Sequence, residues 1–122
     1  MSTTRILAVD DSPSMRDMVR IALCSAGFDV TSASDGQEGL DIARRLDFDL
    51  VLSDVNMPVM DGIQLIRALR AETAYRHTPI LMLTTESSVE RKKEGKEAGA
   101  TGWIVKPFDP AQLVATMHRV LR

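Results

Sequence analysis

The sequence predicts an α/β fold in which five parallel strands form one sheet and helices cover both of its faces. Short, almost continuous apolar runs alternate along the chain with segments of helical periodicity. Strands that are apolar on both sides belong in a sheet that is buried on both faces, and a helix is the connection that parallel strands need. Right-handed crossovers then leave a doubly wound, three-layer sandwich.

Five segments have the length and composition of strands. Four are almost wholly apolar and are expected to be buried, whereas one alternates polar and apolar residues and is expected at the edge of the sheet. The strands expected to be buried are Arg5–Val9 (RILAV), Leu50–Leu52 with its flanks (DLVLS), Ile80–Leu83 (ILML) and Trp103–Val105 (WIV), and the edge strand is Asp29–Ala33 (DVTSA).

The first helix follows the first strand. Ser12 is the expected N-cap, Pro13 occupies the first helical position, and Gly27 ends the helix. Its apolar residues recur at helical spacing, so they are expected to share one buried face. These residues are Met15, Met18, Val19, Ala22, Leu23 and Ala26.

Three further segments carry an apolar face at helical spacing and are expected to be helices. One runs from about Asp35 to Leu46, a second follows Asp61–Gly62, and the last has Asp109 as its cap and Pro110 at its start. The residues expected to point inward are Ile42, Ala43 and Leu46 in the first of these, Leu65, Ile66 and Leu69 in the second, and Leu113, Val114, Met117, Val120 and Leu121 in the last.

The segment Ser88–Ala98 is expected to be a helix of a different kind. It has almost no apolar stripe and contains Gly95, which costs about 1 kcal/mol relative to alanine inside a helix. Two interpretations are open. The helix is either weakly anchored, so that it moves or binds partners, or it is an ordinary solvated surface helix.

The chain of 122 residues fits one domain, and its strands and helices leave no segment for an effector domain. The net charge of -2, with acids and bases mixed, lacks the basic cluster of a nucleic-acid surface. The start, Met1–Arg5, is polar, and no apolar run approaches the length of a membrane span. The single cysteine, Cys24, permits no internal disulfide and is expected to be at least partly buried. We expect a cytoplasmic monomer.

Polar residues stand where the strands predicted to be buried end. Asp10 and Asp11 follow the first strand, Asp54 ends the third, Thr84 ends the fourth and Lys106 ends the fifth. The carboxyl ends of parallel strands lie along one edge of a sheet, and ligands of open α/β sheets bind at that edge. We therefore expect these five side chains to converge.

The combination of residue types favours phosphoryl chemistry with magnesium. Three packed carboxylates repel one another, and a divalent cation that prefers oxygen ligands relieves the repulsion. Magnesium takes one or two carboxylates and also binds phosphate oxygens, so room remains for a phosphoryl group. Asp54 is then the expected nucleophile, forming an acyl phosphate. Thr84 is expected to donate a hydrogen bond to one phosphoryl oxygen, and Lys106 to place a positive charge beside another.

Each of these residues also has an ordinary structural explanation. Acids after a strand often cap the next helix, a lone aspartate is most often a turn former, a threonine after a strand usually caps or turns, and a lysine before proline is usually a solvated charge. The joint placement at four strand ends favours a functional site. His77 and His118 lie far apart in the sequence, so no metal role is expected for them.

Four segments carry a family resemblance: LAVDDSPSMR, LVLSDVNMPVMDG, ILMLTTE and WIVKPF. They resemble the receiver domains of bacterial two-component response regulators, over essentially the whole chain. The resemblance implies a flavodoxin-like (βα)5 fold with strand order 2-1-3-4-5. It also implies that Asp54 is the phosphoacceptor, that Asp10, Asp11 and the backbone carbonyl of Asn56 bind magnesium with it, and that a cis peptide bond precedes Pro107.

Four positions bear on switching and on the lifetime of the phosphoryl group. Asn56 and Glu86 match the pair found in fast-decaying chemotaxis regulators and can position a water for attack on phosphorus. Thr85 stands where the family often has a smaller residue, and it narrows the approach of that water. Trp103 stands where the family usually has tyrosine or phenylalanine. Its indole either moves inward on phosphorylation or stays on the surface as an anchor for a partner.

The expected function is a signalling switch rather than an enzyme with a substrate of its own. The phosphohistidine of a histidine kinase supplies the phosphoryl group, and the output is binding to another protein, such as a motor switch or a phosphatase. Chemotaxis control fits best by resemblance, and a phosphate sink or a phosphorelay intermediate remains open. A haloacid-dehalogenase-type phosphatase would carry D-x-D after the first strand and a cap domain, whereas the two acids here are adjacent. The complete set of acids, hydroxyl and lysine disfavours a purely structural pseudo-receiver.

Overall fold

The five predicted strands form a single parallel sheet. The computed structural model describes residues 3–85 and 89–121, and in it the strands lie in the order β2-β1-β3-β4-β5. Every pair of neighbours is parallel. The strands are β1 (Arg5–Val9), β2 (Asp29–Ala33), β3 (Leu50–Asp54), β4 (Ile80–Thr84) and β5 (Gly102–Val105). The predicted strand order is confirmed.

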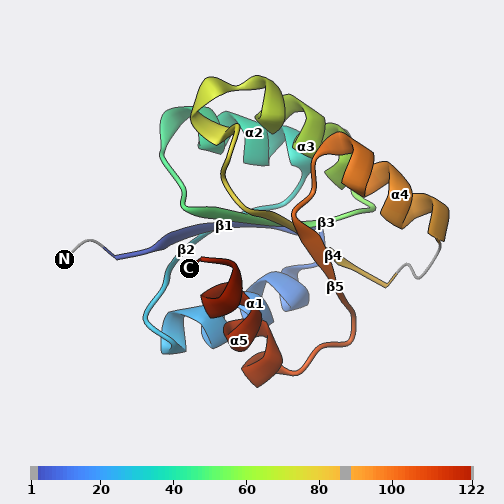
Figure 1. Ribbon diagram of the computed structural model, residues 1–122. Helices are drawn as coiled ribbons and strands as arrows, with labels where there is room; N and C mark the ends of the chain where they lie inside the picture. Colours follow the sequence, from blue (N-terminus) through green and yellow to red (C-terminus); the bar gives the residue numbers. More distant parts are fainter. Residues whose placement is uncertain (1–2, 86–88, 122) are drawn as a thin grey trace.

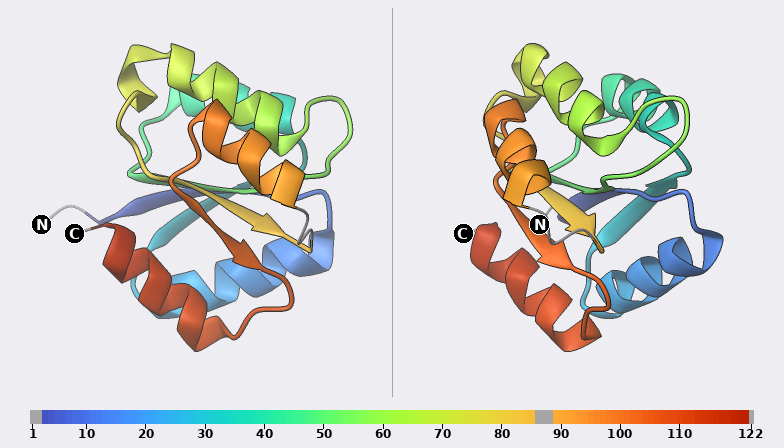
Figure 2. Two further views of the ribbon diagram at one scale, coloured as in Figure 1. Left: turned by 45° about the vertical axis from the view of Figure 1, so that its right-hand side comes forward. Right: turned by 90° about the vertical axis from the view of Figure 1, so that its right-hand side faces the viewer.

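Helices cover both faces of this sheet (Figure 1, Figure 2). On one face lie α1 (Pro13–Ser25) and α5 (Pro110–Val120). On the other lie α2 (Gly36–Arg45), α3 (Gly62–Ala71) and α4 (Val89–Ala98), with a short 3-10 turn, η1 (Thr73–Tyr75), between α3 and β4. The doubly wound, three-layer fold expected from the sequence is therefore confirmed.

Burial along the strands follows their place in the sheet. Every residue of the interior strands β3 and β4 is buried, whereas β2 pairs only with β1 and is largely half-buried or exposed. This is the difference expected between a strand covered on two faces with two neighbours and a strand at an edge. The predicted burial of the last strand is wrong, because β5 pairs only with β4, Trp103 and Ile104 are half-buried and Val105 is 46% exposed.

Capping side chains start the helices, and the two caps predicted from the sequence, Ser12 and Asp109, are confirmed. The side chains of Ser12, Asp35 and Asp109 each accept a hydrogen bond from a backbone N–H in the first turn of α1, α2 and α5. Asp61 and Gln64 form a reciprocal capping box at the start of α3. Caps of this kind contribute about 1 kcal/mol each, so they fix where each helix begins relative to the end of the preceding strand.

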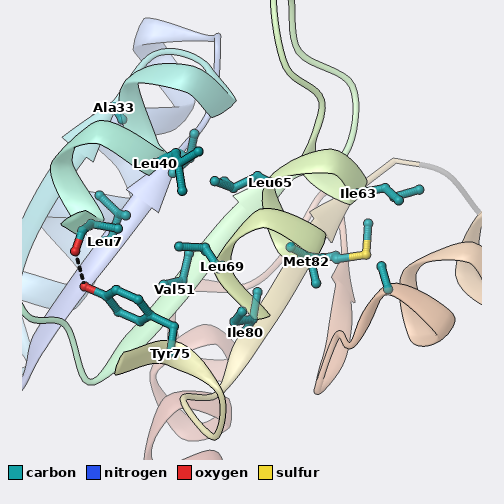
Figure 3. Packing of buried hydrophobic residues seen from close by; sticks show 14 of the residues in the cluster. Leu7, Ala33, Leu40, Val51, Ile63, Leu65, Leu69, Tyr75, Ile80 and Met82 are labelled. Atoms are coloured by element: carbon teal, nitrogen blue, oxygen red, sulfur yellow. Dashed lines mark hydrogen bonds between the residues drawn. The ribbon is translucent and has the colours of Figure 1, made fainter. Parts of the chain in front are cut away.

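The side chains facing α2 and α3 form one of two apolar clusters in the described chain (Figure 3). Leu65, Ile66 and Leu69 of α3 are fully buried, as predicted. The Tyr75 hydroxyl lies 2.7 Å from the carbonyl oxygens of both Ala43 and Leu46. It therefore ties η1 to the end of α2, donating its one proton to either oxygen.

Four burial predictions on the helices are wrong. Met18 is 44% exposed and Leu46 is 41% exposed, and Ala26 and Cys24 are also exposed. The buried residues of α1 are Val19 and Leu23. Met18 and Cys24 are each the sequence neighbour of one of them, so they lie to the side of the buried face. Ala26 and Leu46 follow the last residues of α1 and α2, where the helical periodicity that predicted their burial no longer holds.

The helix α4 is present with the weak apolar stripe that the sequence indicated. Its buried residues are Gly95 and Ala98; Ser88, the predicted first residue, lies outside the described part of the chain. A Cβ at position 95 would overlap the sulfur of Met82 on β4. Gly95 therefore allows α4 to lie close against the sheet, which explains a glycine inside this helix. In residues 3–85 and 89–121, no helix is long and apolar enough to cross a membrane.

Candidate functional site

Polar side chains from four strands meet at one edge of the sheet. Asp10 directly follows β1, Asp54 is the last residue of β3, Thr84 is the last residue of β4, and Lys106 directly follows β5. Because the strands are parallel, these positions lie at the same edge (Figure 2). The convergence expected from the strand ends is what the structure shows.

Three carboxylates form the centre of this edge. Oxygen atoms of Asp10, Asp11 and Asp54 all lie within 4.8 Å of one another. Asp10 is 4% exposed and Asp54 is 9% exposed, whereas Asp11 is exposed. Three negative charges at this separation, two of them largely removed from water, repel strongly unless cations offset them.

Lys106 supplies one of the offsetting charges. Its ammonium nitrogen lies 2.9 Å from Oδ2 of Asp10 and 3.5 Å from Oδ1 of Asp54. Its backbone N–H donates to the carbonyl of Thr84 at 2.8 Å, which holds residue 106 beside the end of β4. The peptide bond between Lys106 and Pro107 is cis, as the family resemblance implied.

The surroundings of Asp54 disfavour its ionised form. Burial raises the pKa of the Asp54 carboxyl above its ordinary value, and the neighbouring Asp10 carboxylate raises that pKa further. The Lys106 ammonium and the backbone N–H of Val55 act in the opposite direction without restoring the ordinary pKa. A further cation at the cluster would favour the ionised carboxylate, which is the nucleophilic form.

Backbone contacts hold the acidic residues in place. The backbone N–H of Ser12 donates to Oδ1 of Asp10 at 2.9 Å, and Arg16 of α1 donates to the Asp10 carbonyl at 2.6 Å. A Cβ at position 62 would overlap the carbonyl oxygen of Asp54, so Gly62 lets the start of α3 approach the end of β3. The role of Arg16 was missed from the sequence, because no local pattern indicates a contact with the preceding strand end.

The donor set fits a hard divalent cation. All three clustered side chains offer carboxylate oxygens, the ligand type that magnesium prefers. A net charge of about -2 remains when the Lys106 ammonium is set against three ionised carboxylates. Asp10, Asp11 and Asp54 would hold the ion, which would supply positive charge to an approaching phosphoryl group. The Asn56 carbonyl stays a predicted fourth ligand; the Asn56 side chain accepts a hydrogen bond from Arg91.

Two residues predicted to take part in switching, Thr84 and Trp103, lie on the side of the site nearest α4. Thr84 is 3% exposed and lines a small cavity, of about 10 Å³, together with Trp103 and Lys92. Trp103 is half-buried, and the Lys92 ammonium lies 5.5 Å from the centre of its ring. Thr85 is exposed beside Thr84, and Glu86 lies outside the described residues.

Comparison with known proteins identifies the family. The model of the family described as "Response regulator receiver domain" matches residues 6–118. The structure of the chemotaxis protein CheY4 of Vibrio cholerae has 53% sequence identity and a TM-score of 0.94, covering 98% of this chain and 99% of that one.

Two curated relatives illustrate different contexts of the domain. Chemotaxis protein CheY-3 of Vibrio cholerae serotype O1 is 41% identical over 117 residues, which is 95% of this chain and 90% of the relative. The DNA-binding response regulator MtrA of Mycolicibacterium smegmatis is 42% identical over 118 residues, which is 97% of this chain but 50% of the relative.

Domains of this kind are signalling switches rather than enzymes, and they bind magnesium at an acidic pocket and interact with a histidine kinase and a downstream target. The acidic cluster, the strand order and the family match agree with one another over almost the whole sequence. The chain therefore belongs to the response regulator receiver domain family of two-component systems.

Proposed function

We propose that the chain accepts a phosphoryl group on Asp54 from the phosphohistidine of a histidine kinase. Asp10, Asp11, Asp54 and the Asn56 carbonyl hold magnesium for this step. The observation that carries the proposal is the convergence of three carboxylates and Lys106 at one edge of the sheet. Because a histidine kinase draws its phosphoryl group from ATP, the exchange is proposed to take place in the cytoplasm.

The residues at the site divide the chemistry among them. The Asp54 carboxylate attacks phosphorus, and the bond from phosphorus to the histidine nitrogen of the donor breaks. The Lys106 ammonium, 3.5 Å from the Asp54 carboxylate, neutralises one phosphoryl oxygen, and the Thr84 hydroxyl donates a hydrogen bond to another. Magnesium, when bound, supplies further positive charge to the phosphoryl oxygens.

The proposed output is binding to another protein in the control of chemotaxis. The chemotaxis relatives CheY4 and CheY-3 match this chain over nearly their whole length. MtrA, which is named as DNA-binding, matches over only half of its length. A phosphate sink or a phosphorelay intermediate is the second candidate. Either role needs only the transfer of a phosphoryl group at the same acceptor site and no output partner.

A binding experiment separates these functions. The wild-type chain, activated by the phosphoryl mimic beryllofluoride with magnesium, is compared with Asp54→Ala for capture of a flagellar motor switch protein. Capture by the wild type alone supports the chemotaxis output. Phosphotransfer to Asp54 without activation-dependent capture would favour the sink or the relay. Turnover of a phosphomonoester substrate would contradict the whole proposal and indicate a phosphatase.

A further inference from the structure

A contact between α4 and the loop after β3 involves Arg91, a residue that has not been assigned a role at the site. Nη2 of Arg91 donates to Oδ1 of Asn56 at 3.2 Å, joining residues that are 35 positions apart in the sequence. Asn56 lies two residues after Asp54, in the loop that leads into α3. The contact therefore connects α4 directly to a side chain beside the phosphoryl acceptor.

The Arg91 guanidinium is held in place on its other edge. Nη1 of Arg91 lies 3.3 Å from Oε2 of Glu94, one turn further along α4. The Arg91 side chain is 29% exposed, so much of it is packed. A planar guanidinium that is anchored through one nitrogen presents its other nitrogen in a fixed direction.

This contact determines how the Asn56 amide is oriented. A guanidinium has only hydrogen-bond donors, so it can bind the oxygen of the amide and not the nitrogen. With Oδ1 facing Arg91, the Asn56 NH2 group must point away from α4. The Asn56 residue is itself exposed, so without Arg91 its side chain would be free to rotate among several orientations.

We propose that Arg91 is a positioning residue for the hydrolysis of the phosphoryl group on Asp54, acting through the side-chain amide of Asn56. In that reaction a water oxygen bonds to phosphorus and the bond from phosphorus to the Asp54 carboxylate breaks. The products are the Asp54 carboxylate and dihydrogen phosphate, which keeps both protons of the water. An amide held in one orientation places the water for in-line attack, whereas a rotating amide does so only part of the time. This inference rests on the function proposed above.

The first test is the decay of phosphorylated protein after removal of acetyl phosphate. Arg91→Ala is expected to lengthen the lifetime of the phosphoryl group by about two- to tenfold, the range that one hydrogen bond supports. Arg91→Lys keeps a hydrogen-bond donor but not the planar guanidinium. The lifetime of its phosphoryl group is therefore expected to lie between those of the wild type and Arg91→Ala. Lys93→Ala removes a positive charge from an exposed position on the same helix. Its phosphoryl group is expected to decay at the wild-type rate.

A double-substitution cycle separates positioning from general damage to α4. Asn56→Ala alone is expected to slow decay, and adding Arg91→Ala is expected to have no further effect. In the unphosphorylated, metal-free protein, the side-chain amide NMR signals of Asn56 are expected to shift in Arg91→Ala and not in Lys93→Ala.

Wild-type or faster decay in Arg91→Ala would overturn the inference. The inference would also be overturned if the effects of Asn56→Ala and Arg91→Ala on the decay rate multiplied in the double variant. Asn56 amide signals that do not shift in Arg91→Ala would overturn it as well. Absence of label on Asp54 in the wild type would instead overturn the proposed function itself.

Discussion

Asp54 is the residue at which function and stability oppose each other most directly. Burial and the neighbouring Asp10 raise the pKa of Asp54 above 3.8, so the folded protein holds the ionised form less readily than the unfolded chain does. At neutral pH, the ionised Asp54 therefore destabilises the metal-free fold. This destabilisation disappears below about pH 3.8, where the carboxyl is protonated in both states.

Asp54→Asn is accordingly expected to raise the free energy of unfolding of the metal-free protein at pH 7. An increase of roughly 1 kcal/mol is the typical size for one substitution, and the difference from wild type should vanish near pH 3. Urea unfolding in the presence of a chelator measures both values. A variant that is less stable than wild type at pH 7 would show that the ion pair with Lys106 outweighs the cost of burying the charge.

Gly62 is a residue whose missing side chain matters. A Cβ at this position would overlap the Asp54 carbonyl oxygen, and the nearby atoms belong to backbone, which cannot move aside easily. Gly62→Ala is expected to destabilise the fold by about 2 kcal/mol and to slow phosphorylation, because the end of β3 must shift. Gly102→Ala is the matched control, since its Cβ would meet only ordinary contact with Leu81, 3.5 Å away. Equal effects of the two substitutions, measured by urea unfolding, would contradict this account.

At the scale of elements, the helix α4 and the strand β5 form the region where a change at Asp54 could be detected. Thr84, Trp103 and α4 surround one small cavity, and the Trp103 ring is covered on one side by Lys92. If Thr84 is drawn toward the phosphoryl group, space opens behind it for the indole to move inward. Apolar burial then favours that movement by roughly 25 cal/mol per Å².

Trp103, the single tryptophan, is therefore expected to report the switch by fluorescence. Beryllofluoride with magnesium should shift its emission to the blue and reduce quenching by iodide, and magnesium alone should do little of either. If binding of the mimic is established independently and neither signal changes, the indole is fixed. Trp103→Ala would then spare phosphorylation and reduce only partner binding, as expected for a surface anchor.

The five strands and the starts of the five α-helices were predictable from the sequence to within one or two residues, whereas the short 3-10 turn η1 was not predicted. Continuous apolar runs and capping residues such as Ser12 and Asp109 act locally, so a local pattern reveals them. Contacts made across long stretches of chain were not predictable. Arg70, for example, donates to the carbonyls of Tyr75, Thr78 and Gly99 and so joins the connection between α3 and β4 to the connection between α4 and β5. No periodicity in the sequence indicates such a contact.

At the scale of the whole molecule, the candidate site was more predictable than several surface details. Parallel strands bring their carboxyl ends together whatever their exact lengths, so placing Asp10, Asp54 and Lys106 required only the strand order. The exposure of Cys24 depends instead on a rotation of about one residue around α1. The Arg91–Asn56 contact depends on how closely α4 lies to the sheet.

Magnesium is expected to stabilise the whole fold, because its proposed ligands form a carboxylate cluster that only the folded chain assembles. At ten times its Kd, the ion should raise the free energy of unfolding by about 1.4 kcal/mol. Asp11→Ala, which removes the exposed carboxylate, should reduce this gain and leave the metal-free protein at least as stable as wild type. Urea unfolding with and without magnesium checks both. An equal gain in wild type and Asp11→Ala would place the ion elsewhere.

The central claim is that Asp54 accepts a phosphoryl group in a magnesium-dependent reaction. It is tested most directly by incubating the chain with acetyl phosphate and magnesium, reducing the product with borohydride, and locating the modified residue by mass spectrometry. We expect one phosphoryl group per chain, conversion of residue 54 to homoserine on reduction, and no phosphorylation in Asp54→Ala or in excess chelator. Phosphorylation that persists in Asp54→Ala, or that is undiminished in excess chelator, would contradict the claim.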